Sequence, residues 1–265
     1  MNELLTNALI GIDNSFHEPY ASLLKGLVFG LPIQIDPSLK TAIIRSGLAH
    51  LVVLSGTNVT LLASLSEKIF FSFGRTMGAI LQLLFLGLFT YMVGLQAPLV
   101  RALIMFICTI VCYMTGRPSY IMWNLFLSVL CIAIFWPEWI TTLSFQLSVL
   151  ATIGIIISGA IKNHFSMELP FLIEVLFESW IVFLVTSPLT FFQFKSISLV
   201  GPFSTALASW IIVPIMIGGI CVSLCYLILP FVTLPIASIV YVGLNYLLWI
   251  IETMSHIPFG YFAWK

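Results

Sequence analysis

Residues 47–61 read GLAHLVVLSGTNVTL and place polar side chains inside an apolar run that is too long for a surface loop. His50, Ser55 and Asn58 carry polar groups, and Gly56 weakens a helix at the same point. Polar side chains at membrane depth are costly unless they line a wet cavity or face another protein surface. The stretch therefore predicts a broken or kinked helix that carries a candidate functional centre.

The composition of the whole chain indicates that lipid is its solvent. Among 265 residues, 60% are hydrophobic and 8% are charged, and the mean hydropathy is +1.14. Soluble domains carry about 25% charged residues, so this chain has too few charges to cover a water-facing surface. Continuous apolar runs favour helices over the short alternating segments of a barrel. We predict an all-α, polytopic helical membrane protein with roughly seven or eight hydrophobic segments, including broken or re-entrant helices and amphipathic surface helices.

The chain divides at residue 47 into two predicted domains. Residues 1–47 are mixed in polarity, and we expect amphipathic membrane-surface helices there. One such helix is expected after Asp36, which can cap it, with Pro37 in the first helical position. Residues 48–265 are expected to form a transmembrane domain. Its simple spans are expected over residues 48–73 (with a break), 75–95, 98–115, 120–135, 138–161, 180–194 and 232–254.

Other segments of the transmembrane domain have less regular patterns. Residues 162–178 mix charged and apolar side chains, and we expect a connector with an amphipathic surface helix. Pro188 is expected to interrupt the span around it. Residues 197–229 exceed one simple crossing, which predicts either a re-entrant hairpin followed by a span or one steeply tilted, broken helix. Residues 256–265 are rich in aromatic side chains and are expected at the membrane interface.

The Lys and Arg residues predict how the spans are oriented. If the first spans cross in turn, one side receives the cations Lys68, Arg75, Arg117 and Lys162. Because an excess of Lys and Arg in short loops marks the cytoplasm, we expect this side to be cytoplasmic. The outer side then receives the cations Lys40, Arg45, Arg101 and Lys195.

Arg101 is the charge whose position is most informative. It lies four residues into a predicted span, on the same helical face as Met105 and Cys108. An Arg at membrane depth costs about 3 kcal/mol on insertion scales. It either fixes the depth of its helix by reaching toward the interface or contacts phosphate groups at a pore mouth. Lys195 has the same two interpretations.

Four other polar positions have alternatives of the same kind. The run of His50, Ser55 and Asn58 lines a polar path or makes hydrogen bonds between helices. Gln146, in the middle of a predicted span, is pore-lining or structural. No carboxylate in residues 47–61 could orient the histidine for hydrolysis, so we expect no enzymatic activity. No His/Cys cluster suggests a metal site, and we expect no cofactor.

Several motifs, in order along residues 22–260, resemble the competence domain of the ComEC family, the inner-membrane DNA channel of natural transformation. The first stretch, GLAHLVVLSGTNVTL, is similar to the family's GLxHLLAISGLHVGL. Arg101-Ala102 follows a tight turn, as in the family, and Gly116-Arg117 comes later. Trp136-Pro137 leads into SFQLSVLATIGI, similar to GFQLSFLAVLGI. Residues 186–215, TSPLTFFQFKSISLVGPFSTALASWIIVPI, resemble SPLxxxxFGxxSLxGPLANLLAxPL.

The sequence departs from the family pattern at a few polar positions. The second histidine of the family's SGLHVGL is Asn58 here, and a glycine is Thr60. Ser144 replaces the glycine of GFQLS, and Ser204-Thr205 stands where the family has an asparagine. Small polar residues remain at these places, so a polar lining is retained with different chemistry.

The resemblance implies a function and a set of partners. Residues 48–265 would form a competence-type channel that conducts single-stranded DNA through the cell inner membrane, which it crosses several times. Arg45, Arg101 and Lys195 would lie at its mouth, and His50, Ser55, Asn58 and Gln146 would line it. The nuclease-like and oligonucleotide-binding modules of many relatives are absent from the sequence. A separate nuclease, a DNA receptor and a cytoplasmic ATP-driven motor are therefore expected.

Two other functions fit the residues. A small-solute or cell-wall-precursor transporter would have similar helices, and it would take up a low-molecular-weight substrate unaffected by DNA. A non-conducting scaffold of a competence assembly would tolerate changes in the polar lining. Zero net charge keeps both alternatives to a DNA channel open, because it provides no global field that attracts a polyanion.

Overall fold

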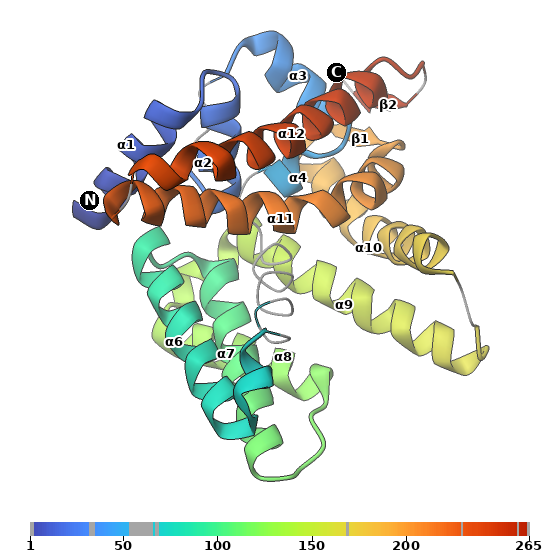
Figure 1. Ribbon diagram of the computed structural model, residues 1–265. Coiled ribbons are helices and arrows are strands. Elements are labelled where there is room, and N and C mark those ends of the chain that lie inside the picture. The colour runs from blue at the N-terminus through green and yellow to red at the C-terminus, as the bar shows by residue number, and fades with distance from the viewer. Residues whose placement is uncertain are drawn as a thin grey trace. The chain divides into compact units, whose positions relative to one another are not determined.

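The computed structural model describes residues 3–31, 35–52, 66, 69–167, 170–228, 230–258 and 260–263. Within them, nearly all regular structure is helical, which confirms the predicted all-α class (Figure 1). The chain forms two compact units. Unit 1 comprises residues 1–54 and 187–265, and unit 2 comprises residues 55–186. The predicted boundary at residue 47 concerns position relative to lipid, and it stays a prediction.

Unit 1 is built around a hairpin of two long helices, α11 (Gly201–Ile228) and α12 (Pro230–Ser255), which lie side by side in Figure 1. The helices approach closely because glycines face branched side chains. A Cβ on Gly218 would lie 2.3 Å from Val240 Cγ2, and one on Gly243 would lie 2.8 Å from Ile215 Cγ1. As residue numbers fall along α11 they rise along α12, so the helices run antiparallel.

Shorter helices cover this hairpin. They are α1 (Glu3–Ser15), α2 (Tyr20–Phe29), α3 (Pro37–Arg45) and α4 (Ala49–Val52). α1 and α2 pack on α11, and α3 packs on α12. Gly219 allows this contact, since a Cβ there would lie 2.8 Å from Leu24 Cδ1 of α2. Polar ties add to it: the Tyr20 hydroxyl donates to Asn245 Oδ1 at 2.7 Å.

A small antiparallel sheet joins distant parts of unit 1. β1 (Ser196–Ser198) pairs with β2 (Tyr261–Ala263), with Ile197 opposite Phe262. The Ser198 hydroxyl donates to the Arg45 carbonyl oxygen at 2.7 Å, which links the sheet to the end of α3. The sequence indicates an interfacial segment at residues 256–265 and does not predict this strand, because three residues are too few for a periodic pattern.

Unit 2 is a set of packed helices that follow one another along the chain. They are η1 (Phe71–Phe73), α6 (Arg75–Val93), α7 (Ala97–Met114), α8 (Ile121–Phe135), η2 (Pro137–Thr141) and α9 (Leu143–His164). α7 packs on α6 and α8, and α9 contacts both α7 and α8. The centre of this packing is a buried cluster of Ala97, Val100, Ile132 and Phe145.

The prediction that residues 162–178 form a connector with an amphipathic surface helix is wrong. α9 continues through Lys162 to His164, and α10 (Phe171–Phe194) begins soon afterwards. Glu174 and Glu178 lie on α10, and both form ion pairs with Lys162 Nζ. Because each charge has a partner of opposite sign, two apolar helices can carry them near their ends. Their mixed polarity had suggested a surface segment.

The prediction that prolines break the spans is also wrong. Pro188 lies inside the continuous helix α10, and Pro214 lies inside α11, which is one helix rather than a re-entrant hairpin. A proline removes one helical hydrogen bond, whereas a break would expose several backbone groups to lipid. The continuous helix is therefore the less costly structure.

Helix starts were predicted with mixed success. Pro37 begins α3 as expected, but Asp36 makes no side-chain capping hydrogen bond. α9 begins at Leu143 instead of residue 138, because Pro137 opens the separate 3₁₀ helix η2. The predicted break at Ser55-Gly56, within residues 48–73, lies outside the described residues.

Length and composition suit several helices to a membrane. In the part of the chain that the structure describes, five helices are long and apolar enough to cross: Ala97–Met114, Leu143–His164, Leu172–Gln193, Gly201–Tyr226 and Thr233–Ser255. Shorter apolar helices occur at Tyr20–Phe29, Thr76–Tyr91 and Ile121–Phe135. These helices confirm a polytopic helical membrane protein.

Gly47→Ala should destabilise unit 1. Gly47 has φ +76°, and a Cβ there would lie 2.5 Å from the Gly201 Cα at the start of α11. The left-handed conformation costs about 1–2 kcal/mol for a residue with a Cβ, and the backbone clash adds to it. We expect a lower thermal midpoint in detergent micelles. Gly116→Ala is the control, because Gly116 has φ +69° but open space around it. Equal shifts for both variants would show that the clash is unimportant.

Candidate functional site

The predicted site residues fall into two groups. Arg101 and Gln146 belong to unit 2, and Arg45, His50 and Lys195 belong to unit 1. His50 lies on α4, and its side chain is outside the described part of the structure. Ser55 and Asn58 also lie outside the described residues. The roles assigned to all of these residues remain predictions.

Arg101 is buried between α7 and α9. The residue is only 2% exposed, although it carries a full charge. Its Nε donates to Ser148 Oγ at 3.1 Å and its Nη2 donates to the same oxygen at 2.8 Å. Its Nη1 contacts the Met105 sulfur, one helical turn along α7, at 3.0 Å. The shared face with Met105, expected from the spacing, is thus present.

The local sequence explains why Arg101 is placed there. Pro98 lies in the first turn of α7, so Arg101 falls within the next turn. Ala97 and Val100 belong to the buried cluster with Ile132 and Phe145, and this cluster holds α7 against α8 and α9. Because this face of α7 packs against α8 and α9, the Arg101 side chain is buried between helices and does not extend along α7 toward water.

Among the described residues, the Arg101 guanidinium contacts neutral groups alone. Among the described residues the ion pairs are Lys25 with Asp13 and Lys162 with Glu174 and Glu178, and none involves Arg101. A guanidinium has five N–H donors, and a hydroxyl and a thioether satisfy only part of that capacity. A buried cation with no carboxylate partner is suited to bind an anion that arrives from outside.

Gln146 lies two residues before Ser148 on α9. Its side-chain amide donates to the Ile140 carbonyl oxygen at 3.2 Å and so ties the first turns of α9 to η2. Trp136 and Trp139 flank this turn, with parallel rings 5.1 Å apart, and both pack against the buried cluster. This geometry gives Gln146 a structural contact, while its predicted place on a conduction path stays a prediction.

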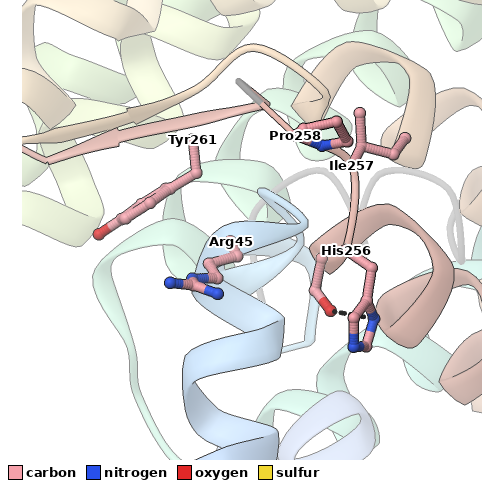
Figure 2. A pocket seen from close by; sticks show the side chains of 6 residues that line it. Arg45, His256, Ile257, Pro258 and Tyr261 are labelled. Atoms are coloured by element: carbon pink, nitrogen blue, oxygen red, sulfur yellow. Dashed lines mark hydrogen bonds between the residues drawn. The ribbon is translucent and has the colours of Figure 1, made fainter.

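Two residues of the unit 1 group, Arg45 and Lys195, lie next to the small sheet. Lys195 directly precedes β1 and is exposed, with φ +50°. Arg45 ends α3 and lines a pocket with Ser255, His256, Ile257, Pro258 and Tyr261 (Figure 2). Two cations predicted for one side of the membrane are thus carried by neighbouring elements, joined by the bond from Ser198 to the Arg45 carbonyl.

Comparison with known proteins identifies the family. The family described as "Competence protein" matches residues 27–265. The chain belongs to the competence protein family. The match confirms the resemblance to the ComEC competence domain that the motifs indicated. No curated protein and no solved structure matches this competence protein.

Sequence reasoning missed several residues of both groups. Ser148 was visible inside the SFQLS motif, and helical spacing alone could not show that it meets Arg101 of another helix. His256 and Tyr261 were assigned to an interfacial segment, but their convergence on Arg45 depends on the strand pairing. Among the described residues, no cluster of His, Cys, Asp or Glu is placed to hold a metal ion.

Ser148→Ala should destabilise the competence protein more than Ser158→Ala. Both serines are buried on α9, but the Ser158 hydroxyl only donates to the Ile155 carbonyl of its own helix. Removing Ser148 leaves the Arg101 guanidinium without its main acceptor, a loss of about 1.5–3 kcal/mol. Unfolding in detergent would measure the difference. A double-mutant cycle with Arg101→Met should recover most of it, and additivity of the two changes would contradict the contact.

Lys195→Val should lower stability by about 1 kcal/mol relative to Lys195→Asn. Both changes remove the charge, but Asn tolerates a positive φ and a β-branched residue does not. Thermal unfolding of the two variants side by side isolates the backbone effect. Identical midpoints would show that the chain relaxes at this position without cost.

Proposed function

We propose that this competence protein conducts single-stranded DNA inward across the cytoplasmic membrane during natural transformation. Its family membership and its long apolar helices support a competence role in a membrane. The observation that carries the finer proposal is Arg101, a 2% exposed guanidinium bound to one serine oxygen and to no carboxylate among the described residues.

The partner of Arg101 matters for this proposal. A guanidinium paired with a carboxylate would have to break an ion pair before it could meet a phosphate. Ser148 provides a neutral acceptor, so a phosphate oxygen can take its place with a gain in charge pairing. As a strand passes, each phosphate would replace Ser148 as the acceptor of the Arg101 hydrogen bonds. When that phosphate leaves, the guanidinium would bond to Ser148 again.

Other parts of the proposed path need little chemistry. Arg45 and Lys195 would attract phosphates at the outer mouth, while His50, Ser55, Asn58 and Gln146 would offer neutral polar groups to a strand of any sequence. Few charges suit conduction, because binding has to be weak enough for the strand to leave each contact. No step requires a covalent reaction, and we propose that the protein is not an enzyme.

Inward movement requires energy and processing from other proteins. The proposed partners are a DNA receptor outside, a separate nuclease that removes the second strand, and a cytoplasmic ATP-driven motor. These proposals rest on the resemblance to the ComEC family.

Arg101→Gln should reduce DNA internalisation by about tenfold while leaving DNA binding at the cell surface unchanged. Cells that lack the gene would be complemented with the wild type or a variant, and nuclease-protected labelled DNA would be counted separately from surface-bound DNA. Arg101→Lys should give intermediate uptake, because a lysine keeps the charge but loses the fork of donors. Arg117→Gln, on an exposed residue beyond the far end of α7, is the matched control.

Immunoblotting of membranes would confirm that each variant is present in equal amount. Normal internalisation without the gene would remove the DNA-channel proposal and make small-solute transport the leading alternative. If Arg101→Gln restores full uptake and the deletion strain shows none, the DNA-channel proposal stands, but Arg101 does not contact the strand. Equal loss in Arg101→Gln and Arg117→Gln would indicate a general effect of lost charge.

A further inference from the structure

The pocket around Arg45 has a chemistry of its own. It lies within unit 1, where the end of α3 meets the segment between α12 and β2. Its volume is about 320 Å³, near the small end of the ~300–1,000 Å³ found for ligand pockets. Figure 2 shows the Arg45 guanidinium between the Tyr261 ring and the His256 imidazole. A pocket of this size accepts a small polar ligand, or the polar end of a larger one.

Arg45 provides a cation that no described residue neutralises. Its side chain is exposed and takes part in none of the ion pairs that the described residues form. None of the described lining residues is acidic. The carboxylate that lies nearest in sequence to Ser255 and His256 is Glu252, which is exposed one turn before His256. The main-chain oxygen of Arg45 already accepts the Ser198 hydroxyl, so the backbone is held while the guanidinium stays free for a ligand. A phosphate is the anion that matches its fork of donors.

The other lining groups add hydrogen-bond acceptors. His256 Nδ1 lies 2.6 Å from the Glu252 carbonyl oxygen, so Nδ1 carries the proton in the neutral ring and Nε2 is left as an acceptor. The Ser255 hydroxyl donates to the same carbonyl at 2.8 Å, and its oxygen also lies 3.4 Å from His256 Nδ1 (Figure 2). Because a hydroxyl oxygen has two lone pairs, it can still accept one further hydrogen bond. A ligand with hydroxyl groups beside its phosphate would satisfy both acceptors.

The place of the pocket in the fold indicates where that ligand comes from. α12 is an apolar helix suited to cross a membrane, and it ends at Ser255, in the wall of the pocket. Ile257 and Phe262, just beyond this end, are 41% and 55% exposed. Exposed apolar groups next to a cationic pocket at the end of a span are the arrangement expected at the depth of lipid head groups.

We propose that the Arg45 pocket binds the head group of an anionic phospholipid that carries hydroxyls, such as a phosphoglycerol group. The phosphate lies on Arg45, and the hydroxyls donate to His256 Nε2 and Ser255 Oγ. A choline head group has the same phosphate but no hydrogen to donate, so it binds more weakly. A bound head group fixes the ends of α3 and α12 at the membrane surface. This site goes beyond the conduction of DNA and does not depend on it, and it assigns Arg45 to lipid in place of the contact with strand phosphates proposed above.

Lipid titration of the full-length protein tests the proposal. The purified protein in detergent micelles would be titrated with dioleoyl phosphatidylglycerol or dioleoyl phosphatidylcholine, with bound lipid counted by native mass spectrometry. We expect phosphatidylglycerol to bind about tenfold more tightly than phosphatidylcholine, and Arg45→Gln to remove this preference. Lys40→Gln, which removes an exposed cation from the same helix outside the pocket, should keep it.

A second measurement separates the lipid from the DNA strand. Oligodeoxythymidylate would be added to the protein saturated with phosphatidylglycerol, with release of lipid as the readout. No release supports the head-group site. Release that depends on Arg45 would overturn it and assign the pocket to the strand. Equal binding of both lipids would also overturn the proposal, as would an equal loss of the phosphatidylglycerol preference in Arg45→Gln and Lys40→Gln. Both results would indicate that lipid adsorbs to the protein surface without a specific site at Arg45.

Discussion

Hydrogen bonding of the backbone in lipid is the constraint on which the rest of this structure depends. A peptide group in hydrocarbon finds no water, so each apolar segment has to remain helical along its length. Pro188, Pro214 and Pro235 are accordingly accommodated inside continuous helices. Because lipid gives helices no hydrophobic reason to associate, they approach through glycine instead, as Gly218 does against Val240.

Three cations of the competence protein, Lys162, Arg101 and Arg45, differ in what surrounds their charge. Lys162 of α9 forms ion pairs with Glu174 and Glu178 of α10, and these ion pairs hold the two helices together. Arg101 is buried against a hydroxyl and a sulfur, and it has no carboxylate partner among the described residues. Arg45 is exposed at the end of its helix, in a pocket without an acidic wall. The first arrangement stabilises a contact between helices, whereas in the other two no described residue neutralises the cation.

The sequence was sufficient for the helical class, for most of the apolar helices and for the family. Composition and long apolar runs determine these features locally, and α7 begins within one residue of the predicted position. Errors arose where a local signal competed with the cost of exposing backbone to lipid, as at Pro188, or where charges found partners on another helix, as at Lys162. The contact between Arg101 and Ser148 spans 47 residues of chain, and the Arg45 pocket requires the pairing of β1 with β2. No pattern within one segment contains such information.

The pairing of β1 with β2 has a mechanical consequence for unit 1. The two strands flank the hairpin of α11 and α12 in the chain, so their ladder closes the hairpin at its open end. Its register places Ser196 opposite Ala263 and Ser198 opposite Tyr261. A shift of one residue would turn Tyr261 to the other face of the ladder. The paired strands therefore oppose sliding of α12 along α11, because any sliding would have to break or shift this ladder.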